Sequence, residues 1–216
     1  MKLFGFIQAK RFISAKDSIL SRDSKITRVR IWRSGYFDSN NNFVHTNVVT
    51  SFLSSFKLGR QSNIGHVSIE TKDLYASLWP EGIDIFNKLK PQDSNSESSS
   101  PTKDEGAEGR PADHLVDFET LDVDAIKQAL DNYIKLGPKY HLIGRNRFFK
   151  ELNANSCSGL GYDLLKQGGI DKLIMNRHFL RDFIVTTPHN LADLVIAAKI
   201  KENEILNQSN PMSGNY

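Results

Sequence analysis

Residues 64–71 read IGHVSIET and residues 74–79 read LYASLW, and these two stretches decide the fold class. The first has the period-two pattern of a strand, with His66, Ser68 and Glu70 on one face and Val67 and Ile69 on the other. Only two residues separate the stretches, so they are close enough to form a hairpin. The sequence Pro-Glu-Gly at residues 80–82 then ends the second strand.

The rest of the chain supplies strands early and helices late. Residues 26–33, ITRVRIWR, alternate branched or aromatic with charged side chains, and residues 114–121 are a further strand candidate. Three later stretches have the apolar periodicity of amphipathic helices, at residues 122–136, 156–167 and 190–206. This order predicts an α+β fold, with a small antiparallel sheet packed by helices.

Composition indicates one domain with polar additions. Residues 91–113 contain no large apolar side chain and carry six acidic against two basic residues, so we expect a disordered insertion there. Residues 1–25 form a basic lead segment, since residues 1–37 hold nine Lys or Arg against two Asp. We therefore expect a single domain over residues 26–206, interrupted at 91–113 and followed by a flexible tail over residues 207–216.

The totals exclude several classes of protein and site. A single cysteine in 216 residues rules out an intramolecular disulfide and a zinc site made of cysteines alone. No pair of histidines has metal-ligand spacing and no glycine-rich nucleotide motif occurs, so we expect no metal or cofactor. The net charge of +3 is too small to indicate nucleic acid as a partner, whereas the basic lead segment suits an anionic membrane surface.

The sequence also favours a cytoplasmic location. No apolar stretch is long enough to span a bilayer, and residues 1–20 lack the unbroken apolar core of a secretory signal. We therefore expect a cytoplasmic protein, with delivery into a host cell without a cleavable signal as a further possibility by analogy.

Cys157 is the first candidate for chemistry. It follows the loop sequence NANS and begins an amphipathic helix that ends at Gly168 and Gly169. The N–H groups and the positive dipole end of a helix N-terminus favour a thiolate, and the same N–H groups can hold an oxyanion. Gly159 and Gly161 fit a first turn that a substrate or a packed sheet approaches closely. A small buried apolar role is the alternative for the thiol.

His66 is the candidate base. A thiol nucleophile needs a group that takes its proton near neutral pH, and imidazole is the suitable side chain. Of the six histidines, only His66 stands at the head of a strongly patterned strand. The alternative is a histidine that is merely solvated on a polar strand face.

The two motifs resemble a known group of proteins. GHVSIET and LYASLWP, followed far downstream by NSCSGLGYDLL and a Gly-Gly pair, resemble the circularly permuted papain-like thiol enzymes. These include the lecithin retinol acyltransferase-like proteins and permuted relatives of the NlpC-type cell-wall peptidases. The resemblance spans residues 26–169 and implies a permuted papain-like fold, with His66 as general base and Cys157 as nucleophile. It also implies a polar third residue that orients the imidazole, for which Ser77 and Glu70 compete, and Asn155 as a helper at the oxyanion.

Residues and resemblance together predict a cysteine-dependent hydrolase, a peptidase or amidase that acts on a peptide, amide or acyl substrate through a thioester. Two alternatives stay open. One is a lipid acyltransferase or thioesterase of the same fold, and the other is a catalytically inactive papain-like module that binds a protein partner.

Overall fold

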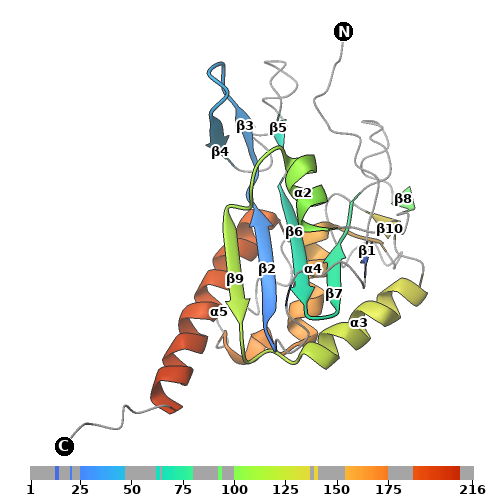
Figure 1. Ribbon diagram of the computed structural model, residues 1–216, viewed down its shortest axis with the longest axis vertical. Helices are drawn as coiled ribbons and strands as arrows, with labels where there is room; N and C mark the ends of the chain where they lie inside the picture. Colours follow the sequence, from blue (N-terminus) through green and yellow to red (C-terminus); the bar gives the residue numbers. More distant parts are fainter. Residues whose placement is uncertain are drawn as a thin grey trace, which may run out of the picture.

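A five-stranded antiparallel sheet forms the centre of the molecule. The computed structural model describes residues 13–14, 20, 25–46, 62–63, 65–79, 92–93, 100–136, 139–140, 154–174 and 187–209. The sheet has the order β1-β7-β6-β2-β9, and each neighbouring pair is antiparallel (Figure 1). Its strands are β1 (Ile13–Ser14), β2 (Thr27–Trp32), β6 (His66–Thr71), β7 (Leu74–Ser77) and β9 (His114–Phe118). The predicted hairpin is β6–β7, and the α+β class with a small antiparallel sheet is confirmed.

Four helices and two smaller sheets complete the described part of the chain. The small sheets have the orders β4-β3-β5 and β11-β10-β8. Their strands are β3 (Gly35–Phe37), β4 (Phe43–His45), β5 (Ser62–Asn63), β8 (Gln92–Asp93), β10 (Lys139–Tyr140) and β11 (Ala154–Asn155). The helices are α2 (Pro101–Glu108), α3 (Val123–Lys135), α4 (Cys157–Gln167) and α5 (Pro188–Ser209), with a short 3-10 turn η2 (Ile170–Lys172).

The hydrophobic core lies between one face of the sheet and helices α3, α4 and α5. Val29, Ile31, Val67 and Ile69 point to this face and are buried together with apolar side chains of the three helices. In Figure 1, α4 lies behind β6, and α5 runs along the β9 side and extends past the end of the sheet. A Cβ at Gly161 would lie 2.9 Å from Val67 Cγ1, so the glycine in the first part of α4 permits the close approach of this helix to the sheet.

Helix α2 covers the other face of the hairpin. The sequence pattern predicts that His66, Ser68 and Glu70 face away from the core, but all six residues of β6 are buried. The buried residues of α2 are Pro101, Asp104 and Glu108, so this helix docks mainly through polar side chains. The expectation of disorder over residues 91–113 is therefore wrong for residues 100–113. A segment with almost no apolar surface is ordered here because buried hydrogen bonds, not apolar burial, fix its position.

The ends of α2 are fixed by local chemistry and by ties to β2. Ser100 is the N-cap and accepts a hydrogen bond from the Lys103 backbone N–H, Pro101 is at the start of the helix, and Gly109 ends it at a φ of 69°. Beyond the helix, Trp32 Nε1 donates to the Arg110 carbonyl at 3.0 Å. The Arg110 guanidinium in turn pairs with Asp113.

Helices α3 and α4 begin where the sequence predicts, whereas α5 begins at Pro188, two residues before the predicted start at residue 190. Asp122 caps α3 and Ser156 caps α4. Helix α5 continues to Ser209, three residues into the predicted tail, and β1 adds part of the basic lead segment to the sheet. The rest of the lead segment before residue 20 and the tail after residue 209 lie outside the described residues. Among the described helices, none is long and apolar enough to cross a membrane.

Glu202 joins α5 to the loop between β9 and α3. Its Oε1 accepts hydrogen bonds from the backbone N–H groups of Glu119 and Thr120, each at 2.8 Å, and its Oε2 pairs with Lys199 at 2.6 Å. Glu202→Ala leaves two N–H groups without their acceptor, so we expect the free energy of unfolding to fall by about 2–3 kcal/mol. Urea denaturation measures it. Glu204→Ala on the same helix removes only an exposed pair with Lys201 and is expected to change stability little; an equal loss in both variants would contradict this assignment.

Candidate active site

His66 lies at the start of β6, between both tryptophans of the chain. It is paired in register with Trp32 of β2, whose ring centroid lies 5.5 Å from that of the imidazole. Trp79, just after β7, stacks on the imidazole with centroids 4.1 Å apart and an interplanar angle of 19°. Gly65 precedes the histidine at a φ of +81°, and a Cβ there would lie 2.4 Å from the Trp32 carbonyl oxygen. The glycine therefore lets β6 begin directly against β2, which fixes the position of the ring.

Asp104 of α2 is the acidic partner of His66. Its Oδ2 lies 3.3 Å from His66 Nε2, and both side chains are almost completely buried. Ser77 Oγ lies 2.8 Å from the same Nε2 and donates to Asp104 Oδ1 at 3.1 Å. Ser77 therefore bridges the imidazole and the carboxylate, and the ring nitrogen Nε2 is directed to this acidic side of the site.

Two further donors hold the Asp104 carboxylate. The Tyr75 hydroxyl donates to Oδ2 at 2.7 Å and the Trp79 indole N–H donates to Oδ1 at 2.8 Å. Burial by itself would raise the pKa of Asp104, but the charge of His66 and the hydrogen bonds from His66, Tyr75 and Trp79 hold that pKa below its usual value. Asp104 is thus a buried, ionised carboxylate whose oxygens are occupied by donors.

Cys157 is the first residue of α4, and its thiol is near enough to His66 to influence the imidazole. Ser156 caps the helix by accepting from the Gly159 N–H at 3.0 Å, so α4 begins at the cysteine and places the positive end of its dipole there. The cysteine is buried, at 5% exposure. The Cys157 side chain is close enough to the imidazole to help raise the pKa of His66. Because Nε2 faces Ser77 and Asp104, we infer that Nδ1 is the nitrogen that faces the thiol.

The imidazole is held in its charged form. Burial lowers the pKa of His66, but the charge and hydrogen bond of Asp104, followed by those of Cys157, outweigh burial and raise that pKa to about 10. The stacked indole of Trp79 adds a ring face that favours a cation. The site can therefore hold a protonated imidazole between a carboxylate and a thiol at neutral pH.

The structure separates the two candidates for the third residue. Ser77 hydrogen-bonds to His66, whereas Glu70 is four residues further along β6, where it pairs with the buried Arg30 guanidinium. For Asn155 the structure describes the backbone, which pairs with Tyr140 in parallel register; the predicted role of its side chain lies outside the described residues.

Sequence reasoning missed Asp104. Its segment has the composition of a disordered linker, which conceals the acidic residue among six acids of residues 91–113. A local signal was present, because Ser at residue 100, Pro at 101 and Gly at 109 have the spacing of a helix N-cap, first turn and C-terminal glycine.

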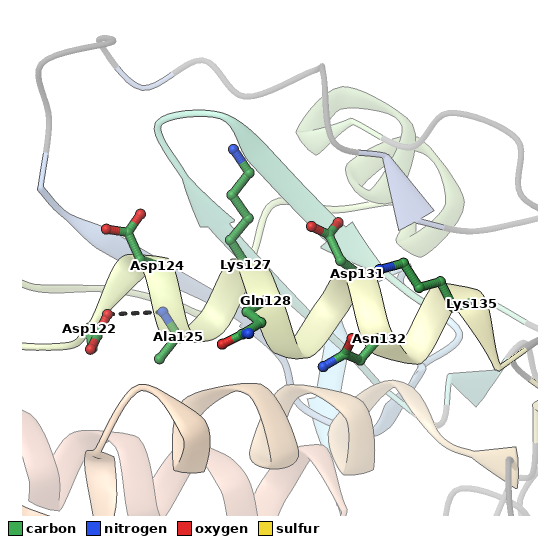
Figure 2. A pocket seen from close by; sticks show the side chains of 8 residues that line it. All are labelled: Asp122, Asp124, Ala125, Lys127, Gln128, Asp131, Asn132 and Lys135. Carbon is green, nitrogen blue, oxygen red and sulfur yellow. Dashed lines mark hydrogen bonds between the residues drawn. The ribbon is translucent and has the colours of Figure 1, made fainter.

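Among the described residues, no three His, Cys, Asp or Glu side chains form a cluster that could hold a metal ion. An open hollow of about 560 Å³ lies over the outward face of α3 and is distinct from the Cys157 site (Figure 2). Three carboxylates, two lysines and two amides of α3 and its N-cap line it, and none of the residues around Cys157 borders it. Mixed, solvated charges of this kind are the ordinary outer face of an amphipathic helix.

Comparison of the chain with models of protein families, with curated proteins and with solved structures found no match.

Proposed function

We propose that this protein is a cysteine-dependent hydrolase, of the peptidase or amidase kind, with Cys157 as nucleophile, His66 as general acid and base, and Asp104 as the group that orients the imidazole. The observation that carries the proposal is the place of His66, 3.3 Å from the buried carboxylate of Asp104 and next to Cys157, which begins α4 and raises the pKa of the imidazole. Nucleophile, base and orienting acid in this order constitute the arrangement that covalent acyl transfer requires.

The residues support a two-step reaction. The Cys157 thiolate attacks the substrate carbonyl carbon, and the resulting oxyanion lies at the N-terminus of α4, where backbone N–H groups favour negative charge. His66 then gives its proton to the leaving amine as the C–N bond breaks, which leaves a thioester on Cys157. In the second step His66 takes a proton from water, the hydroxide attacks the thioester, and the thiol is released with the carboxylic acid product.

The acid partner favours an active enzyme over an inactive binding module. Serine alone orients an imidazole weakly. If Ser77 were the only partner of His66, the site would equally suit an inactive binding module. Asp104 supplies a charged partner behind Ser77, and three donors besides the imidazole surround its carboxylate. A buried carboxylate costs free energy to maintain. The placement of this carboxylate against the imidazole is therefore best explained by a catalytic role of His66.

A chromogenic acetyl ester tests the proposal, because an ester forms the same acyl-enzyme as an amide but reacts faster. Incubation with p-nitrophenyl acetate should add one acetyl group to the intact protein, with the acetyl on Cys157 in the wild type and absent in Cys157→Ser. Since the chain has one cysteine, an acetyl thioester can form only there. Acetylation no faster than that of the unfolded chain would refute the proposal. Turnover of peptide amides against phospholipid esters then separates the amidase from the lipid-acting alternative.

A further inference from the structure

Tyr75 lies directly behind the carboxylate of the site. It is completely buried in β7, and its hydroxyl lies 2.7 Å from Asp104 Oδ2 and 2.8 Å from Ser68 Oγ. A phenol has one proton, and an ionised carboxylate can only accept, so the proton of Tyr75 goes to Asp104 and the Ser68 hydroxyl donates to the phenol oxygen. The three side chains form a directed line of hydrogen bonds that ends at the oxygen nearest His66 Nε2.

The strand register puts this line next to a second pair of charges. Glu70 is opposite Tyr75 across the hairpin, and Arg30 is opposite Ser68 on β2. Arg30 pairs with Glu70, and its guanidinium carbon lies 5.7 Å from the centre of the Tyr75 ring. Tyr75 therefore separates a neutralised Arg30–Glu70 pair from Asp104.

The groups that face Asp104 come from two strands and the segment after β7. Among the described residues they include His66 of β6, Tyr75 and Ser77 of β7, and Trp79. On its own helix, Glu108 is a further buried acid, one turn away. Helix α2 has almost no apolar anchor, since two of its three buried side chains are acidic. The donors to Asp104 therefore decide where the helix lies and in which direction its carboxylate points.

We propose that Tyr75 is a positioning residue of the site, whose hydroxyl keeps Asp104 ionised and directs its Oδ2 toward His66. This inference rests on the proposed function for its effect on catalysis, while its effect on Asp104 is independent of any reaction. A phenylalanine would fill the same space, so only the hydroxyl distinguishes the two side chains. Removing a donor from a charged carboxylate favours the protonated acid, and it also frees α2 to shift.

The test compares Tyr75→Phe with Tyr133→Phe. Tyr133 is the matched control because its hydroxyl is buried but has no hydrogen-bond partner among the residues that the structure describes. Carbon NMR of the aspartate carboxyl groups, assigned with Asp104→Asn, should show the Asp104 titration midpoint about one to two pH units higher in Tyr75→Phe and unchanged in Tyr133→Phe. The acid limb of Cys157 alkylation by iodoacetamide should move to higher pH in the same variant.

An Asp104 midpoint that is the same in Tyr75→Phe and wild type would overturn the inference. If Cys157 forms no acyl-enzyme but the Asp104 midpoint shifts as expected, the proposed function fails and the role of Tyr75 in holding Asp104 stands. Should Tyr75→Phe not fold, a fluorinated tyrosine at position 75 keeps the shape of the side chain and strengthens its hydroxyl as a donor. That substitution should lower the Asp104 midpoint, and an unchanged or raised midpoint would again contradict the inference.

Discussion

Asp104→Asn is expected to slow the acylation of Cys157 by about 10²- to 10⁴-fold. Asparagine has almost the same shape but no charge, so the imidazolium loses the partner that raises the pKa of His66. A carboxylate accepts hydrogen bonds through both oxygens, here from Tyr75, Trp79 and Ser77. The amide nitrogen of asparagine is itself a donor, so it would face one of these donors without an acceptor. Burst kinetics with p-nitrophenyl acetate measure the acylation rate.

Asp117→Asn is the matched control for this prediction. Asp117 also accepts two side-chain hydrogen bonds, both at 2.7 Å from Arg28, but it lies at the opposite end of β2 from the Trp32–His66 pair. The Asp117→Asn variant should acylate Cys157 at a rate near that of the wild type. Equal losses in the two variants would indicate that Asp104 stabilises the fold without serving the thiol.

His66→Ala is expected to lower the acylation rate further, by at least about 10³-fold, because it removes both the base and the proton donor for the leaving group. His45→Ala, which changes a half-exposed histidine, is the control and should be nearly silent. Activity of His66→Ala close to that of the wild type would exclude a catalytic role for this histidine.

The raised pKa of His66 also determines how the free energy of unfolding should depend on pH. Its pKa is raised in the folded protein from 6.5 to about 10, so the charged ring stabilises the folded state fully below pH 6.5. This contribution is lost as the pH rises through about 10. Urea midpoints of wild type and His66→Gln should therefore converge between pH 6.5 and 10. A constant difference between their midpoints over this range would mean that the folded-state pKa is not raised.

Local patterns in the sequence were sufficient for most of the central layer. The alternation along residues 64–71 and the two-residue turn after it predict the β6–β7 hairpin, and the loop before Cys157 predicts a helix that begins at the thiol. These features depend on neighbours in the chain, so periodicity and capping reveal them. The placement of His66 near Cys157 also follows from the order of the motifs in the resemblance.

The acidic half of the site was not predictable in the same way. Asp104 becomes a partner of His66 only because α2 folds over the polar face of the hairpin, and that docking uses hydrogen bonds between residues 25 or more positions apart. The composition of a segment indicates how much apolar surface it can bury but takes no account of such hydrogen bonds. A polar segment is therefore predicted to be disordered. Glu70 was a reasonable competitor by strand face, but its pairing with Arg30 depends on the neighbouring strand β2.

The most direct test of the account is the rate at which iodoacetamide alkylates Cys157 as a function of pH, measured for wild type, His66→Ala and the urea-unfolded chain. Every thiol signal comes from one residue, because the chain has a single cysteine. We expect the folded wild type at pH 6.5 to react faster than its own unfolded chain, and His66→Ala to lose this advantage, because the proposed nucleophile depends on the neighbouring imidazole. A folded wild type that follows the pH profile of the unfolded thiol, with or without His66, would contradict a Cys157–His66 nucleophile.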